Sequence, residues 1–165
     1  MVLRPLRMGD CTIISEAFTA QGWQKPVEQY ELYVALQESR ERDIIVAEMN
    51  GNFVGYLTIK WVSDYPPFKA QHIPEIVDLN VLKKYQRRGI ATKMMDEAER
   101  RIAQRSAFAG IGFGVDQDYG AAQILYVKRG YVPDGNGLVY CSQPVKYGDS
   151  IRVDDDLVLF LIKKL

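Results

Sequence analysis

One stretch, residues 75–102, limits the folds open to this chain more than any other, and it reads "EIVDLNVLKKYQRRGIATKMMDEAERRI". The stretch begins with an apolar run over residues 75–82 that reads as a strand. After a short basic segment, apolar residues recur three and four positions apart over residues 91–106, which predicts an amphipathic helix. A strand that passes almost directly into a helix predicts a domain that mixes both kinds of element.

The rest of the chain shows the same mixture. Asn50-Gly51 lies between two apolar runs and fits the positive φ angles of a tight hairpin turn. Asp10 is placed to cap a helix, and consecutive prolines predict a loop over residues 65–72. The fold class expected is α/β of the α+β kind, with about seven strands and about four helices. Further strands are expected at residues 1–6, 43–49, 53–62, 108–115, 138–145 and 157–165, and further helices at residues 11–21, 27–40 and 120–130.

Length and charge set further limits. The 165 residues suit one domain, residues 1–165, because a chain of this length buries about two thirds of its unfolded surface. Lys and Arg total 21 and Asp and Glu total 21, so no overall charge favours binding to nucleic acid or to an anionic membrane. No apolar run reaches the ~18 residues of a membrane span. These properties favour a protein of the cytoplasm.

The two cysteines give no sign of a metal site or a disulfide framework. Cys11 and Cys141 lack the spacing of metal ligands, and their use fits a reducing compartment. Neither cysteine lies in a motif that suggests a nucleophile. We therefore expect no metal and no covalent enzyme intermediate.

The basic loop between the strand and the helix has the features of an anion site. The N–H groups of a first helical turn have no partner within the helix, and the positive end of the helix dipole lies with them. Gly89 lets a ligand approach the backbone closely, and Ala91 keeps the next point of approach small. Arg87 and Arg88 add positive charge, and Thr92 adds a hydroxyl. An ordinary strand-to-helix turn with solvated basic residues would carry the same pattern.

Two motifs resemble those of the GNAT N-acetyltransferase superfamily. "QRRGIA", residues 86–91, is similar to the family's pyrophosphate loop, Q/R-x-x-G-x-G/A, and it follows "LNV", which resembles the family's fourth strand. "GAAQILYVKRGYVPDG" is similar to the family's helix A-x-x-L-Y-x-x-x-G-F/Y and to the strand after it. The resemblance implies the GNAT fold, a mixed and mostly antiparallel sheet that splays apart between strands 4 and 5. The positions that match the second motif are Ala122, Leu125, Tyr126, Gly130 and Tyr131.

The resemblance implies transfer of an acetyl group from acetyl-coenzyme A (acetyl-CoA) to a primary amine, which would attack directly in a ternary complex. Leu79, Asn80 and Val81 would pair with the pantetheine arm, and one of their N–H groups would polarise the thioester carbonyl. The other residues implied in cofactor binding are Gln86, Arg87, Arg88, Gly89, Ile90, Ala91, Thr92, Tyr119 and Ala122.

One position departs from the family's pattern. Many members have an asparagine three residues before the motif alanine, where this chain has Tyr119. At this position the chain therefore lacks the carboxamide that contacts the pantetheine arm in those members. Tyr119 would donate a hydrogen bond through its hydroxyl or close the pocket with its ring.

The resemblance also implies two proton carriers. Tyr126 matches the family's tyrosine that protonates the departing thiolate, since a phenol with a pKa near ~10 is protonated at neutral pH. A buried core aromatic is the other interpretation. Glu75 resembles by its position the glutamate base of the histone-acetylating branch, and strict alternation puts it on one face with Val77 and Leu79. A bulge in the strand would change that face, and Asp78 and His72 are alternative bases.

The acceptor is the least defined part of the prediction. Trp23, Tyr65 and His72 lie in the segments that build the acceptor side in the family, and they are the candidate acceptor-binding residues. A small amine, an amino acid, an aminoglycoside and a protein N-terminus all remain open. Homodimers are common in the family, so a homodimer is among the expected states.

Three other functions compete with this one. "GIGFG" at residues 110–114 suggests a dinucleotide oxidoreductase, but its spacing is not G-x-G-x-x-G and it lies within a strand pattern. An RNA-binding module is disfavoured by zero net charge and by the lack of an aromatic sheet motif. The remaining alternative is a non-catalytic protein of the same fold that senses acyl-CoA or binds a partner.

Overall fold

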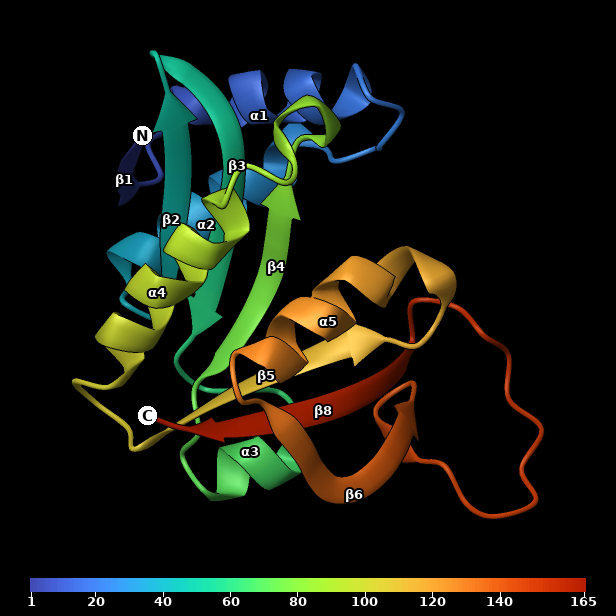
Figure 1. Ribbon diagram of the computed structural model, residues 1–165. Coiled ribbons are helices and arrows are strands. Elements are labelled where there is room, and N and C mark those ends of the chain that lie inside the picture. The colour runs from blue at the N-terminus through green and yellow to red at the C-terminus, as the bar shows by residue number, and fades with distance from the viewer. The chain divides into compact units, whose positions relative to one another are not determined.

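The chain of the computed structural model, which describes residues 1–165, divides into two units. The first unit contains Met1–Trp61 and Ile76–Arg101, and the second contains Val62–Glu75 and Ile102–Leu165. Both units contain strands and helices (Figure 1). The structure has eight strands and five α-helices, compared with about seven and about four expected.

Most of the elements lie close to the positions predicted from the sequence. The strands are β1 (Val2–Pro5), β2 (Arg42–Met49), β3 (Asn52–Lys60), β4 (Glu75–Val81), β5 (Phe108–Gly114), β6 (Val132–Tyr140), β7 (Gln143–Pro144) and β8 (Leu157–Lys164). The α-helices are α1 (Asp10–Thr19), α2 (Val27–Glu38), α3 (Pro66–Ala70), α4 (Ile90–Ile102) and α5 (Gly120–Lys128). Two short 3-10 helices, η1 (Lys83–Tyr85) and η2 (Gln117–Tyr119), precede α4 and α5.

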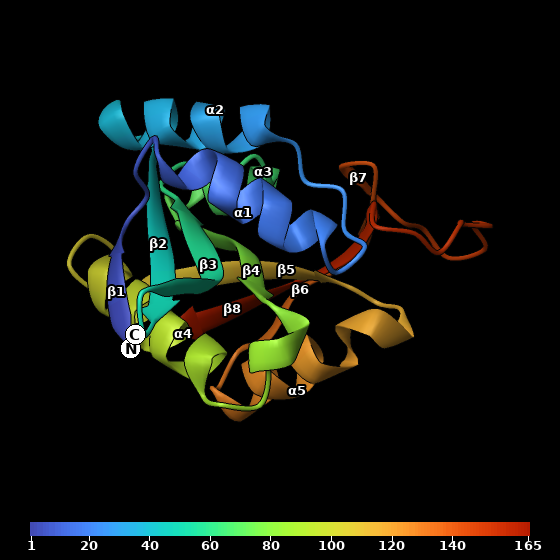
Figure 2. The same ribbon diagram turned by 90° about the horizontal axis from the view of Figure 1, so that it is seen from above.

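In the first unit, β1 to β4 lie side by side in chain order, with helices on both faces. β1 pairs antiparallel with β2, β2 pairs antiparallel with β3, and β4 is the next neighbour of β3. Helices α1 and α2 cover one face and α4 covers the other (Figure 2). The core beneath α1 and α2 is aromatic, because Phe18, Tyr30 and Tyr56 are fully buried and meet edge to face.

The amphipathic pattern of α4 is confirmed. Met94, Met95 and Ala98 are fully buried, whereas Lys93 is exposed. Near the end of the helix, Arg101 donates to Asp43 of β2 at 2.9 Å and so ties the C-terminal turn of α4 to the sheet. The N-terminus of α4 is therefore held in place by packing along the whole helix.

The hairpin between β2 and β3 is formed as predicted. Asn50 and Gly51 have φ angles of +52° and +77°, and Met49 pairs directly with Asn52. Two consecutive residues with positive φ give the turn that matches the twist of the flanking strands.

In the second unit, the strand order is β5-β8-β6-β7, and all the pairs are antiparallel. A ring carbon of Phe68 in α3 lies 2.2 Å from the position that a Cβ on Gly110 would occupy, so α3 packs directly on β5. Phe113, three residues further along β5 and hence on its other face, contacts Tyr126 of α5. Helices α3 and α5 therefore cover opposite faces of this strand group.

Two of the predicted elements were wrong in detail. Residues 66–70 form α3 and not a loop, because prolines at the first positions of a helix lack only N–H groups that would have no helical partner. The strand expected over residues 138–145 is interrupted by Cys141 and Ser142, whose φ angles of +46° and +64° make a tight turn between β6 and β7. No glycine marks this turn in the sequence.

The predicted cap at Asp10 was also wrong. Asp10 is the first residue of α1, and the helix has no side-chain cap. Its carboxylate accepts hydrogen bonds from the Arg4 guanidinium at 2.6 and 2.7 Å and from the Arg7 N–H at 2.8 Å. Burial raises the pKa of Asp10, but these hydrogen bonds outweigh it and hold the pKa below its usual value.

None of the helices combines the length and the apolar character needed to span a bilayer.

Candidate active site

The loop after β4 has a backbone suited to an anion. Arg87 and Gly89 have φ angles of +59° and +74°, and α4 begins at the next residue, Ile90. Within the helix, the first backbone hydrogen bond is donated by Lys93 to the Gly89 carbonyl at 3.1 Å. The N–H groups of residues 90–92 therefore precede the helical hydrogen bonds and are available to a ligand at the positive end of the helix dipole.

Hydrogen bonds that involve side chains connect this loop to β4 and to another loop of the first unit. The Gln86 amide donates to the Val81 carbonyl at 3.2 Å, and the Lys83 N–H donates to the Gln21 side chain at 2.9 Å. Arg87, Arg88 and Gly89 are exposed, and a Cβ at Gly89 would meet no atom within 4 Å. The loop thus has a fixed backbone and an open outer side.

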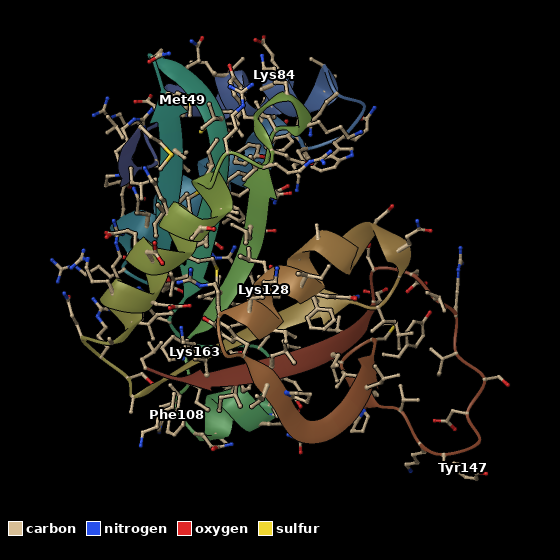
Figure 3. The ribbon with its side chains drawn as sticks, in the orientation of Figure 1. Met49, Lys84, Phe108, Lys128, Tyr147 and Lys163 are labelled. Carbon is tan, nitrogen blue, oxygen red and sulfur yellow. The ribbon has the colours of Figure 1, made fainter.

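Positive charge gathers around the loop. The Lys84 ammonium and the Arg88 guanidinium lie over the Tyr85 ring, at 5.1 and 5.5 Å from its centroid. Lys84 lies at the turn that leads from β4 toward α4 (Figure 3). Together with Arg87 these cations make a local basic surface on a chain with no net charge.

β4 contains a backbone irregularity at Asp78. Its φ angle is +56°, in the left-handed region that strand residues other than glycine rarely adopt. Strict alternation along residues 75–81 was therefore wrong beyond Val77, because a left-handed residue inside a strand turns the following side chains, as a bulge does. Leu79, Asn80 and Val81 lie beyond this point and are all half-buried.

A polar network holds Asp78. Its carboxylate accepts a hydrogen bond from the Tyr33 hydroxyl at 2.6 Å and lies 3.5 Å from the Arg42 guanidinium. The guanidinium in turn lies over the Tyr33 ring, 4.6 Å from its centroid. Thr58 donates to the Val77 carbonyl at 3.3 Å. Side chains of α2, β2 and β3 therefore fix the backbone of β4 at its irregular point.

Glu75, the first residue of β4, is 8% exposed. Its carboxylate accepts a hydrogen bond from the Ser63 hydroxyl at 2.5 Å. The Ser63 oxygen accepts the Tyr65 N–H at 3.0 Å, and Ser63 itself is 1% exposed. A buried carboxylate that accepts a hydrogen bond from an oriented hydroxyl is a candidate proton acceptor.

Tyr126 lies in α5 and is 5% exposed. Its ring lies 6.1 Å from that of Phe113 and 6.2 Å from that of Tyr131, so strand and helix fix its orientation. Burial raises the pKa of Tyr126 above its usual value. The phenol is therefore protonated at neutral pH.

Tyr119, where the family has asparagine, closes the end of β5. Its ring occupies the space that a Cβ on Gly114 would need, at 2.4 Å. Its hydroxyl donates to Asp155 at 3.2 Å. Ala122 is half-buried in the first turn of α5. The Tyr119 hydroxyl thus has a protein partner in this structure.

The three candidate acceptor residues differ in their surroundings. Trp23 is half-buried, stacks on Phe18 at 5.8 Å and has the Lys83 ammonium 5.3 Å from its ring. Tyr65 is 7% exposed and donates to Asp134 at 2.8 Å. His72 is exposed, with a φ angle of +55° just after α3. Their role in acceptor binding stays a prediction.

The candidate site residues are divided between the two units. The first unit holds the loop 86–92 and the Asp78 network, and the second holds Glu75, Tyr119 and Tyr126. Sequence reasoning missed Ser63, Tyr33 and Arg42, which act through contacts with residues far along the chain. No local pattern marks a serine that meets a glutamate twelve positions later.

Comparisons with known proteins identify the family and the fold. The sequence model of the Acetyltransferase (GNAT) family matches residues 11–131. No curated protein matches the sequence. Several solved structures share the fold along almost their whole lengths. A ribosomal-protein-alanine N-acetyltransferase from Brucella melitensis has a TM-score of 0.72 at 17% identity, with 100% of both chains covered.

Two further structures extend the comparison. An acetyl transferase from Salmonella typhimurium that modifies the N-terminal serine of 50S ribosomal subunit protein L7/L12 has a TM-score of 0.73 at 11% identity, with 99% of this chain and 94% of that chain covered. A spermidine N-acetyltransferase mutant from Vibrio cholerae has a TM-score of 0.69 at 16% identity, with 99% and 95% covered. The fold is the GNAT fold, as the two motifs implied, and the chain belongs to the GNAT acetyltransferase family.

Proposed function

We propose that this protein transfers an acetyl group from acetyl-CoA to a primary amine, which attacks directly in a ternary complex. The observation that carries the proposal is the backbone of residues 87–92 in a chain of the GNAT family. Two left-handed residues, Arg87 and Gly89, lead into a helix whose first N–H groups have no helical partner. Such a backbone binds phosphate groups.

The donors around this loop fit the nucleotide end of acetyl-CoA. The pyrophosphate carries negative charge, and Arg87 and Arg88 are exposed beside the N–H groups of residues 90–92. The open space at Gly89 admits a phosphate against the backbone. Leu79, Asn80 and Val81 supply half-buried backbone groups for the pantetheine arm, and one of their N–H groups would polarise the thioester carbonyl. Acetyl-CoA supplies the activated acetyl thioester.

Tyr126 is the proposed acid. When the amine nitrogen bonds to the acetyl carbon and the carbon–sulfur bond breaks, the phenol would give its proton to the sulfur. Burial raises the pKa of Tyr126, so the phenol carries its proton at neutral pH. The new amide nitrogen would release its extra proton to solvent, and solvent would return a proton to the phenolate.

Glu75 is the proposed base. An amine with a pKa near ~10.4 is almost wholly charged at neutral pH, so it must lose a proton before it attacks. Glu75 is buried and held by Ser63, which suits a group that must accept a proton in one place. Asp78 is the weaker candidate because Tyr33 and Arg42 both engage its carboxylate.

The acceptor class is best sought among polyamines and peptide N-termini. Structural relatives include a spermidine N-acetyltransferase and enzymes named for acetylation of ribosomal proteins. The test measures thiol release from acetyl-CoA with spermidine, with peptides that begin with alanine or serine, with a lysine peptide and with an aminoglycoside. Binding of acetyl-CoA is titrated on the same sample.

The outcomes separate the alternatives. Thiol release that depends on one amine would support the transferase and name its acceptor class. Tight binding of acetyl-CoA without release from any amine would contradict a transferase for these acceptors and favour a non-catalytic acyl-CoA sensor. Absence of binding would contradict the assignment of residues 87–92 to the pyrophosphate.

A further inference from the structure

Ser63 lies in a hydrogen-bond arrangement that allows only one direction for its proton. The Ser63 oxygen accepts the Tyr65 N–H at 3.0 Å and lies 2.5 Å from a Glu75 oxygen. A hydroxyl has a single hydrogen, and the Tyr65 N–H already supplies its own. The Ser63 proton is therefore donated to Glu75, and the N–H of Tyr65 orients the hydroxyl that makes this donation.

The residue that orients Ser63 is itself rigid. The Tyr65 ring stacks on Phe160 with centroids 3.7 Å apart and an angle of 5° between the planes. Its hydroxyl donates to Asp134 at 2.8 Å, and Phe68 meets its ring edge to face at 4.9 Å. The N–H of Tyr65 is thus fixed by contacts to β8, to β6 and to α3.

The backbone beside Glu75 is fixed as well. The Pro74 carbonyl accepts a hydrogen bond from the Gly110 N–H at 2.9 Å. Gly110 is the position where β5 packs directly against Phe68. Both ends of the segment from Ser63 to Glu75 are therefore held against the same aromatic cluster. The hydrogen bond between Ser63 and Glu75 joins two residues whose backbones are held in place.

We propose that Ser63 is a positioning residue that holds the Glu75 carboxylate in the orientation needed to take a proton from the acceptor amine. The proposal rests on the proposed function, in which Glu75 is the base. A glutamate side chain has three rotatable bonds, and a misplacement of about 1 Å in a catalytic group can cost about 10²-fold in rate. The oriented Ser63 hydroxyl removes that freedom without touching the substrate.

The experiment compares four variants: S63A, S63T, E75Q and the double variant S63A/E75Q. The readout is kcat for thiol release with the amine that gives the fastest release, with the KM of acetyl-CoA and the melting temperature measured in parallel. We expect S63A to lower kcat by about 10²-fold, with no change in the KM of acetyl-CoA, because a misplacement of about 1 Å affects the chemical step. S63T keeps the hydroxyl and is expected to restore most of kcat.

The double variant separates positioning from a merely structural role. If Ser63 acts only through Glu75, the kcat of S63A/E75Q equals that of E75Q. If Ser63 supports the fold alone, S63A lowers kcat by the same factor in both backgrounds, and that result would overturn the proposal. Should S63A not fold, S63C replaces it, because a thiol is a weak donor at nearly the same place.

Failure of this proposal can be told from failure of the proposed function. A slow E75Q enzyme together with S63A at the wild-type kcat would leave the base in place and remove only the role of Ser63. An E75Q enzyme at the wild-type kcat would remove Glu75 as the base and Ser63 with it. A wild-type protein that releases no thiol with any amine would contradict the transferase and both assignments.

Discussion

Burial of Tyr126 keeps its phenol in the acid form, which is the form that its proposed catalytic step requires. Burial raises the pKa of its phenol, so the acid form is present at neutral pH and persists into alkaline pH. We expect Y126F to lower kcat about 10²-fold, the lower end of the range for loss of a general acid. The affinity for acetyl-CoA should stay unchanged, since the ring contacts to Phe113 and Tyr131 remain.

The pH profile offers a second check on Tyr126. Because its pKa is raised, loss of the acid should not limit kcat at any pH below the usual phenol value of ~10. A fall in kcat that appears near neutral pH and disappears in Y126F would contradict this expectation. A kcat of Y126F equal to that of the wild type would remove Tyr126 as the acid.

Gly89 permits a test that separates backbone conformation from packing. A Cβ there would meet no atom within 4 Å, so an alanine is opposed only by the φ angle of +74°. We expect G89A to weaken acetyl-CoA binding about tenfold by altering the N–H groups that follow. Gly51 is a matched control, because it has a φ angle of +77° and equally open space in the β2–β3 turn.

Calorimetric titration of both variants distinguishes the two effects. G51A should lose about 1 kcal/mol of stability to the same backbone strain and bind acetyl-CoA as the wild type does. Equal affinity of G89A and G51A would mean that the pyrophosphate lies elsewhere.

At the scale of elements, β4 should respond to mutation unlike an ordinary strand. Glycine within a strand is normally less stable than alanine by about 0.5–1 kcal/mol. Asp78 has a φ angle of +56°, which glycine adopts freely and alanine does not. We therefore expect D78G to be more stable than D78A by about 1 kcal/mol, although both lose the bonds to Tyr33 and Arg42.

Urea unfolding of the two variants measures this difference directly. The comparison is internally matched, since D78G and D78A differ by one methyl group and neither carries the carboxylate. If D78A were the more stable variant, the left-handed conformation of β4 would not exist in solution. Y33F, which removes the hydroxyl bonded to Asp78, should weaken acetyl-CoA binding if the irregularity sets the direction of Leu79 and Asn80.

The elements differ in how well the sequence predicts them. The β2–β3 hairpin and α4 are predictable because Asn-Gly and the 3.6-residue period are local signals. The Cys141-Ser142 turn and the left-handed Asp78 are not, because the residues with positive φ are not glycines. Helix α3 was not predicted because proline disfavours the middle of a sheet but is favoured at the start of a helix. The prediction applied only the first of these two rules.

The residues of the candidate site also differ in how well the sequence predicts them. The loop at residues 86–92 has a motif of contiguous residues, so the sequence alone predicts it. Ser63 and Glu75 meet only because α3 folds the chain back between them, and Tyr33 reaches Asp78 across forty-five positions. Tertiary contacts of this kind have no local signature.

At the scale of the whole molecule, the charge balance makes cofactor binding a local electrostatic effect. The chain has 21 basic and 21 acidic residues, yet Lys84, Arg87 and Arg88 lie together beside the proposed pyrophosphate site. We expect the Kd of acetyl-CoA to rise about tenfold between about 0.05 M and about 0.5 M salt, because the screening length falls severalfold. Titration at several salt concentrations measures the slope.

A control ligand isolates the phosphate contribution. An acetyl thioester of pantetheine without phosphates should bind with little dependence on salt. Equal salt dependence for both ligands would place the charge effect away from the phosphates. R88Q should flatten the slope for acetyl-CoA and leave that for the pantetheine thioester unchanged.

The alternate glycines of β5 have a consequence for how this chain can evolve. Gly110 and Gly114 have no Cβ because the rings of Phe68 and Tyr119 fill that space, at 2.2 and 2.4 Å from where the atom would be. Their φ angles lie outside the left-handed region, so neighbouring rings and not backbone conformation restrict these sites. A lineage can therefore acquire an alanine at Gly110 only after a smaller residue has replaced Phe68, which makes the order of the two substitutions part of this strand's history.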